Sequence, residues 1–249
     1  MVVEEKFQVA YGELEQRMKA LAEADGDVYL PNPEPAGPVE YILICMEPSL
    51  GRWARSDDDG RDGRAKVEAG FRNFLDGIEP MILHFCVRRF LCERGQRYHI
   101  TDFSKGAMLV KHAGGARVER YGKWYELLKE EIDLMATPDA RIIAVGKAVA
   151  QHLNQFKFPR KFTPVIHYSP LAAKSRSERV AGYEDRFRAF KDSVSLEDVL
   201  ATARDVLKES RVPAEIQSAA LSHMGKSELS TSRRQLIFIY KLAFEAMRS

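Results

Sequence analysis

The feature of this sequence that most constrains its fold is a series of four short apolar runs, each ending in polar or unusual residues. The runs are YILIC (41–45), RYHIT (97–101), RIIAVG (141–146) and PVIH (164–167). Helical patterns separate them, notably at 71–91 and 121–135. Strands that alternate with helices at this spacing form parallel sheets covered on both faces. The sequence therefore predicts an α/β fold of three αβα layers around a central, mainly parallel four-stranded sheet.

The segments around these runs suggest three parts. Residues 4–24 have the pattern of an amphipathic helix, and PNPEPAGP (31–38) is too rich in proline for a helix or a central strand. After residue 192 the pattern is helical throughout, with Ser195, Pro213 and Ser230 or Ser232 at the expected helix starts. We predict an N-terminal helix and connector (1–37), an α/β domain (38–192) and a C-terminal helical extension (193–249).

Composition excludes several classes of protein. The 249 residues are 45% hydrophobic and 30% charged, which is ordinary for a globular protein. No apolar run approaches the roughly 20 residues of a membrane span, and the acidic N-terminus does not resemble a signal peptide. Three cysteines without paired spacing indicate reduced thiols and argue against a four-cysteine metal or iron–sulfur site. We expect a cytoplasmic protein with no membrane partner and no cofactor.

The charge is unevenly distributed although the net charge is only +2. Residues 154–191 contain nine lysines and arginines against three acidic residues. Such a segment is typical of a surface that binds a polyanion. A solvated, salt-bridged surface is the alternative, and charge alone does not decide between them.

Polar residues follow each of the predicted strands. They are Glu47, Asp102, Lys147 and His167, which lie up to 120 residues apart in the chain. In open parallel sheets, ligands bind at the carboxyl ends of the strands. We therefore expect these four side chains to converge on one site.

Four motifs in the same order resemble those of the uracil-DNA glycosylase superfamily. ILICMEPS (42–49) stands where that superfamily has its first motif, and HYSPL (167–171) resembles its last, His-Pro-Ser-Pro-Leu. YHITDFSKG and WYELLKEEIDLMATPDARIIAVGKAVAQHL are similar to segments of the iron–sulfur branch. The resemblance covers roughly residues 38–185. It departs from the family pattern at Cys45, where a glycine is usual, and at Tyr168, where a proline is usual.

The resemblance implies roles for two of these residues. Glu47 takes the place of the carboxylate that orients water below the sugar. His167 takes the place of the donor that stabilises negative charge on the departing base. An exposed turn carboxylate and a hydrogen-bonded strand-end histidine are the plain alternatives. No lysine stands where a Schiff-base nucleophile is expected, so the implied enzyme is a monofunctional, cluster-free glycosylase that leaves an abasic site.

The resemblance also implies a surface that grips DNA. Ser169 would meet a phosphate, and Leu171 would wedge into the base stack while the target base is flipped out. The remaining expected DNA contacts are basic, at Lys174, Arg176, Arg179, Lys105 and Lys147. The alternative is an ordinary surface loop with Leu171 packed inward.

Two departures from the family point to the base. Asp102 replaces an asparagine that reads uracil, and a carboxylate accepts hydrogen bonds only, which suits the exocyclic amine of cytosine. A protonated Asp102 would weaken this argument. Ser49 replaces a tyrosine that excludes substituents at the pyrimidine 5-position. Together they favour a cytosine enlarged at that position, such as the hydroxymethylated or glucosylated cytosine of phage genomes. The alternative for Asp102 is the N-cap of a helix over FSKGAM (103–108).

An aromatic side chain should stack on the flipped base. Trp53, Phe71 and Phe74 are candidates, although the spacing of the two phenylalanines also fits the buried face of a helix. Arg52, Arg55, Arg61 and Arg64 of the polar segment 51–64 could contact phosphates. The run Asp57–Asp59 has no metal-loop pattern, so no metal is expected.

Three other functions compete with a glycosylase of modified cytosine in antiviral defence. The chain could be a uracil-specific repair glycosylase. It could be a catalytically inactive nucleic-acid-binding protein of the same fold, or a hydrolase of a free nucleotide or another small glycoside. The oligomeric state does not follow from the sequence.

Overall fold

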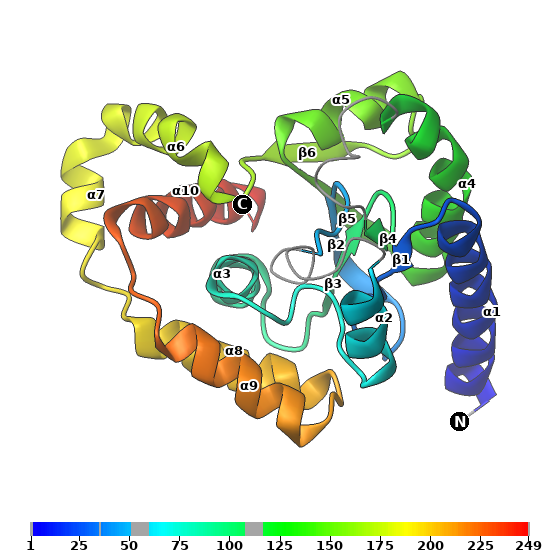
Figure 1. The fold of residues 1–249 in the computed structure, drawn as a ribbon. Coiled ribbons are helices and arrows are strands. Elements are labelled where there is room, and N and C mark those ends of the chain that lie inside the picture. Colours follow the sequence, from blue (N-terminus) through cyan, green and yellow to red (C-terminus); the bar gives the residue numbers. More distant parts are fainter. Residues whose placement is uncertain (1, 35, 51–59, 108–116, 249) are drawn as a thin grey trace. The chain divides into compact units, whose positions relative to one another are not determined.

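A computed structural model describes residues 2–34, 36–50, 60–107 and 117–248 of the chain (Figure 1). Its residues form two compact units. The first comprises Met1–Asn73 and Arg97–Pro164, and the second comprises Phe74–Gln96 and Val165–Ser249. The three-part division at residues 37 and 192 stays a prediction.

The first unit is built on a parallel sheet with the strand order β3-β2-β5-β6. Its elements are α1 (Val2–Ala24), β1 (Val28–Tyr29), β2 (Val39–Cys45), α2 (Arg61–Glu68), β3 (Tyr98–Asp102), β4 (Gly106–Ala107), α4 (Arg117–Met135), β5 (Ala136–Val145), α5 (Lys147–Gln155) and β6 (Phe162–Val165). The short strands β1 and β4 form a separate antiparallel pair. The predicted α/β class with a four-stranded parallel sheet, helices beside it and further helices after it is confirmed, and these elements are consistent with three αβα layers.

The core of this unit explains why these segments form these elements. The run Tyr41–Cys45 of β2 is buried on both faces, as expected for a central strand of a parallel sheet. Ile42 and Ile44 pack with Phe7 of α1 and Ile132 of α4 in one cluster. Helices α1 and α4 lie side by side (Figure 1) and share a second cluster around Trp124.

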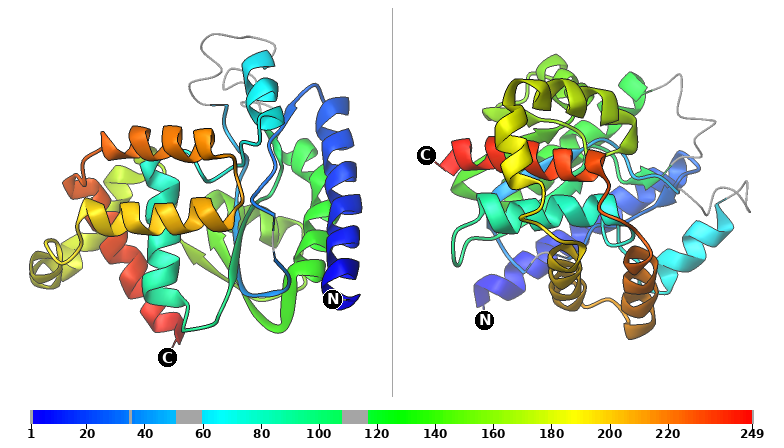
Figure 2. Two further views of the ribbon diagram at one scale, coloured as in Figure 1. Left: turned by 90° about the horizontal axis from the view of Figure 1, so that it is seen from below. Right: turned by 90° about the vertical axis from the view of Figure 1, so that its left-hand side faces the viewer.

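The second unit is helical apart from the last residue of β6. Its elements are α3 (Ile78–Cys86), the π-helix η2 (Val87–Leu91), the 3₁₀ turn η4 (Pro170–Ala172), α6 (Ala173–Val180), the 3₁₀ turn η5 (Ala181–Tyr183), α7 (Glu184–Phe190), α8 (Leu196–Glu209), α9 (Ala214–Gly225) and α10 (Thr231–Arg248). Helices α8 and α9 form a hairpin, and α10 packs against α3, η2 and α6 (Figure 2).

The helix starts predicted for this unit are confirmed. Ser195 forms a capping box with Asp198 at the start of α8. Pro213 is the N-cap of α9, and α10 begins directly after Ser230, whose carbonyl accepts from Arg234 N at 3.0 Å. These ends are set by local sequence, which is why the pattern alone identifies them.

The helix predicted over 71–91 is wrong in its first part. Helix α3 begins only at Ile78, after Gly77 with φ 126°, and Pro80 falls in its first turn. Phe71 and Phe74 therefore lie in the preceding turn rather than on a helix, although both are buried. The strand predicted over 164–167 also ends earlier, at Val165.

None of the helices in the described part of the chain has the length and apolar content that a membrane span requires.

Candidate functional site

Three strand ends lie together at one edge of the first unit's sheet. Cys45 of β2 is paired with Asp102 of β3, and Ile44 of β2 is paired with Ala144 of β5. Because the strands are parallel, the segments that follow them leave from the same edge. The chain order of the strands reverses between β2 and β5, and such a switch point is where α/β sheets bind ligands.

Glu47 follows the end of β2 at this edge, and hydrogen bonds hold the backbone just before it. Beyond the end of β2, the carbonyl of Cys45 accepts from Phe103 N at 2.9 Å, and the carbonyl of Met46 accepts from Ser104 N at 3.1 Å. The buried Pro48 follows, and proline restricts the residue before it to extended conformations. The half-buried Glu47 is therefore fixed by strand pairing on one side and by proline on the other.

Lys147 lies at the start of α5, directly after β5 and Gly146. Gly146 has φ 108°, a backbone conformation that residues other than glycine rarely adopt, so this sharp turn needs glycine. The Lys147 side chain is exposed. The structure thus brings Glu47, Asp102 and Lys147 to one edge, as predicted.

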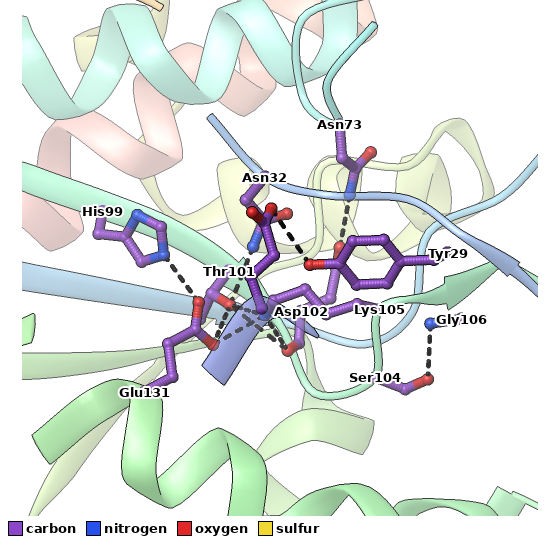
Figure 3. A network of polar contacts seen from close by, with 11 residues as sticks. Tyr29, Asn32, Asn73, His99, Thr101, Asp102, Ser104, Lys105, Gly106 and Glu131 are labelled. Carbon is purple, nitrogen blue, oxygen red and sulfur yellow. Dashed lines mark hydrogen bonds and ion pairs between the residues drawn. The ribbon is translucent and has the colours of Figure 1, made fainter. Parts of the chain in front are cut away.

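Asp102 is the last residue of β3 and is only 2% exposed. Its Oδ2 atom accepts a hydrogen bond of 2.5 Å from Nδ2 of Asn73 (Figure 3). Asn73 is itself anchored, since its backbone N–H donates to the carbonyl of Pro31 at 2.8 Å. The next residue, Phe74, has φ 61°, which is rare for a bulky side chain. An unusual backbone conformation therefore delivers Asn73 to Asp102.

The electrostatic environment of Asp102 favours its neutral form. Burial raises its pKa to about 8, and Glu47 and Glu131 also raise it, whereas Lys105 and the hydrogen bond from Asn73 lower it. At neutral pH Asp102 is therefore mainly a carboxylic acid, which can both donate and accept a hydrogen bond.

This result changes the sequence-based interpretation of Asp102 in two ways. A neutral Asp102 both donates and accepts a hydrogen bond, as an amide does, so it no longer favours cytosine over uracil by accepting only. The alternative role as a helix N-cap is wrong, because the described residues after Asp102 form a loop and then β4 instead of a helix.

A buried ion pair lies directly behind Asp102 (Figure 3). Lys105 Nζ donates to Glu131 Oε2 at 2.7 Å and to the Asp102 carbonyl at 3.3 Å. Glu131 also accepts from Thr101 Oγ1 at 2.9 Å and contacts His99 Nε2 at 3.1 Å, while Asn32 Nδ2 donates to Thr101 Oγ1 at 3.0 Å. We call Asn32, His99, Thr101, Lys105 and Glu131 the buried network.

Within the buried network, the pKa of Glu131 is moved in the opposite direction from that of Asp102. Burial alone would raise it, but the ammonium of Lys105 and the contact with His99 lower it to about 2. One carboxyl group is thus held charged and the other neutral. Lys105 differs from its predicted place on a DNA-binding surface, because its side chain is buried with Glu131.

His167 belongs to the second unit, where it begins a loop with a defined hydrogen-bond pattern. Its Nδ1 atom accepts from Ser169 N–H at 3.0 Å. Burial, and secondarily Arg176, lowers its pKa to about 4, so the ring is neutral at pH 7. Because a backbone N–H can only donate, the proton of the neutral ring lies on Nε2. His167 therefore presents an N–H donor without a positive charge.

Leu171 lies in the same loop, here named the wedge loop (167–171), and is 96% exposed. Ser169 caps the turn, since its Oγ accepts from Leu171 N at 3.3 Å. The alternative in which Leu171 packs inward is therefore wrong. Single exposed apolar residues are common on protein surfaces, so this exposure is compatible with the predicted wedge but is not by itself evidence of a partner.

The bases after the wedge loop divide into two kinds. Lys174 and Arg179 of α6 are exposed, as a phosphate contact requires. Arg176 differs from its predicted role, because it is 2% exposed and donates to the carbonyl oxygens of Tyr168 and Ser169. Its guanidinium therefore hydrogen-bonds to the backbone of the wedge loop instead of facing solvent.

The remaining predicted residues are placed as follows. Ser49 is exposed and lies two residues beyond Glu47. This position is compatible with the predicted role of Ser49, which is to leave space beside the base. Phe71 is buried in the first unit. Trp53, Arg52 and Arg55 lie outside the described residues, while Arg61 and Arg64 are exposed on α2.

Sequence reasoning missed Asn73 and Glu131. Glu131 had a recognisable signal: it is four residues from Leu127 and three from Leu128, so it falls on the apolar face of its helix. Asn73 had none, because its contact with Asp102 joins residues 29 apart through an irregular turn.

Among the described residues, no group of three or more His, Cys, Asp or Glu side chains could hold a metal ion. No protein-family model matches the sequence. No curated protein and no solved structure matches the chain. The likeness to the glycosylase superfamily therefore depends on the four motifs.

Proposed function

We propose that this chain is a monofunctional DNA glycosylase that hydrolyses the N-glycosidic bond of a flipped-out pyrimidine and leaves an abasic site. The observation that carries the proposal is the wedge loop, which combines a neutral Nε2–H donor at His167 with an exposed apolar side chain at Leu171. A base-flipping enzyme needs both functions, a donor for the departing base and a wedge for the stack. Glu47, at the switch point of the sheet, is the carboxylate of this proposal.

The reaction consumes one water molecule. The Glu47 carboxylate orients the water and accepts its proton as the oxygen bonds to C1′ of the sugar. The bond between C1′ and the base nitrogen breaks, and its electron pair leaves with the base. The Nε2–H of His167 donates to the base oxygen that gains negative charge, and the base then takes a proton from solvent. Lys174 and Arg179 bind the flanking phosphates.

A 5-modified cytosine of phage DNA is the proposed substrate, and defence against phages in the cytoplasm is the proposed role. Ser49 leaves room beside the 5-position. A neutral Asp102 donates to N3 of cytosine and accepts from its exocyclic amine through the carbonyl oxygen. The raised pKa of Asp102 also favours a second candidate, uracil, because the neutral acid can pair with N3–H and O4 as an amide does.

A panel of duplexes tests this function. Each duplex carries uracil, cytosine, 5-hydroxymethylcytosine or glucosylated hydroxymethylcytosine at one position, and alkali then cleaves any abasic site. We expect strand breaks at the 5-modified cytosines. Breaks at uracil alone would reject the modified base but keep the glycosylase. Binding without breaks on every duplex would instead indicate an inactive DNA-binding protein.

Ser49 provides a matched pair of variants for the choice of base. Ser49→Tyr fills the space beside the 5-position, so it should abolish release of the glucosylated base and leave smaller bases as substrates. Ser49→Ala adds no bulk and should keep the wild-type order of substrates. An unchanged order in Ser49→Tyr would contradict the placement of Ser49 beside the base.

A further inference from the structure

The C-terminal helix α10 contacts the backbone that leads into the wedge loop. The hydroxyl of Tyr240 donates to the carbonyl of Ile166 at 2.8 Å. Tyr240 is fully buried and stacks on Phe244, with ring centroids 5.2 Å apart. The residue before His167 is therefore hydrogen-bonded to a rigid aromatic side chain of α10.

Arg176 holds the other part of the same loop. One of its guanidinium nitrogens donates to the carbonyl oxygens of both Tyr168 and Ser169, and Nη1 donates to Ser232 Oγ of α10 at 3.1 Å. Within the described part of the chain, no ion pair joins Arg176 to a carboxylate. Burying a cation is costly unless its donors are used. Here Nη1 and Nη2 donate to α10 and to the loop, while Nε has no hydrogen-bond partner in the described part of the chain.

The loop also has hydrogen bonds of its own. The backbone N–H groups of Ser169, Leu171 and Ala172 donate to His167 Nδ1, Ser169 Oγ and the Ser169 carbonyl. The carbonyl groups of Ile166, Tyr168 and Ser169 each accept a hydrogen bond, from Tyr240, Arg176 and the Ala172 N–H respectively. The loop is thus held by hydrogen bonds along its backbone, while the side chain of Leu171 at its tip is 96% exposed.

We propose that α10 is the positioning element of the wedge loop, with Tyr240 and Arg176 as its positioning residues. This inference rests on the proposed function, and it assigns a role to the C-terminal helices. A loop that is already ordered loses less conformational freedom when it enters the base stack. Loss of either positioning contact therefore weakens the insertion of Leu171 and loosens the placement of His167 in the same loop. Only the first effect needs a paired duplex.

The test compares kcat/KM for the same target base in a paired duplex and in a single strand, because a single strand needs no extrusion. Tyr240→Phe removes one buried hydrogen bond and keeps the ring. We expect about a fivefold decrease on the duplex, the factor that corresponds to roughly 1 kcal/mol, and a smaller decrease, through His167 alone, on the single strand. Arg176→Lys should show the same selectivity.

Tyr121→Phe is the matched control. Tyr121 is as buried as Tyr240, but its hydroxyl has no hydrogen-bond partner in the described part of the chain. The control should change neither substrate. Leu171→Ala should reduce activity on the duplex alone, and Tyr240→Phe added to Leu171→Ala should cause no further decrease in the ratio of duplex to single-strand kcat/KM. Equal losses on both substrates, or a further decrease of that ratio in the double variant, would overturn the proposal.

A second measurement separates this proposal from the glycosylase itself. If the wild-type chain releases no base, the proposed function fails, but amide hydrogen exchange at Leu171 and Ala172 still reports the order of the loop. Tyr240→Phe and Arg176→Lys should accelerate that exchange several-fold relative to Tyr121→Phe. Exchange at the wild-type rate would show that α10 does not position the loop.

Discussion

The sheet edge of the first unit and the wedge loop of the second unit both reverse the usual distribution of side chains. At the edge, Lys105 and Glu131 are charged and almost completely buried. In the loop, Leu171 is apolar and almost completely exposed. A buried charge is costly unless it is paired, and an exposed leucine buries no apolar surface on folding. The first region therefore depends on its ion pair for stability, whereas the exposed side chain of the second region, the proposed wedge, does not contribute to stability.

The buried network should be the most sensitive part of this comparison. Lys105→Met removes the cation and leaves the buried Glu131 carboxylate with its contacts to His99 and Thr101. We expect a loss of about 3–5 kcal/mol in the free energy of unfolding, measured with a chemical denaturant.

The control for that variant is the exposed pair of Arg204 and Glu197, which has the same separation of 2.7 Å as Lys105 and Glu131. Arg204→Ala should cost no more than about 1 kcal/mol, because solvent screens an exposed pair. Similar losses in both variants would show that burial does not distinguish the two ion pairs.

A buried and an exposed leucine of the second unit test how much the wedge loop contributes to stability. Leu207 of α8 is fully buried, and Leu207→Ala should cost about 2–5 kcal/mol. Leu171→Ala should leave the free energy of unfolding within about 0.5 kcal/mol of the wild-type value. Thermal or denaturant unfolding measures both. A large loss in Leu171→Ala would mean that this side chain stabilises the fold.

The protonation of Asp102 predicts a pH dependence. Its pKa is raised in the folded chain, so this contribution to stability is fully present below the unfolded pKa of about 4 and is lost as the pH rises toward 8. Asp102→Asn lacks the ionisation. Its stability relative to the wild type should therefore rise by roughly 1.4 kcal/mol per pH unit, or about 3 kcal/mol between pH 5 and pH 7. A difference independent of pH would show that Asp102 is already charged.

His167 gives the smallest effect in energy but a specific spectroscopic signature. Its lowered pKa means that the ring stays neutral from pH 8 down to about pH 5, with the proton on Nε2. The ¹⁵N chemical shifts of the ring distinguish the two tautomers and the charged form. A titration near pH 6.5, or a proton on Nδ1, would remove the neutral donor from the mechanism.

The sequence predicts the parts of this structure that depend on local pattern. Apolar runs separated by helical periods predict the parallel sheet, and Ser195 predicts the start of α8. The same reasoning identifies Glu47 and Asp102 as strand-end residues, because the carboxyl ends of parallel strands share one edge.

The rest depends on contacts between distant residues. Lys105 and Arg176 read as surface bases, yet both are buried because partners far along the chain accept their hydrogen bonds. Arg176 had one signal, since it lies four residues before the buried Val180 on the same face of α6. Nothing local predicts that Asn73 meets Asp102, or that Tyr240 meets Ile166.

Base release that depends on the Glu47 carboxylate is the most direct measurement of the proposed glycosylase activity. The substrate is a duplex with 5-hydroxymethylcytosine, and alkali converts each abasic site to a strand break. Glu40 lies near the start of β2, the strand that ends two residues before Glu47, and its carboxylate accepts from Arg97 N–H at 2.7 Å. We predict that the wild type and Glu40→Gln produce breaks, and that Glu47→Gln reduces them at least about a hundredfold. Breaks at the wild-type rate in Glu47→Gln would contradict the account.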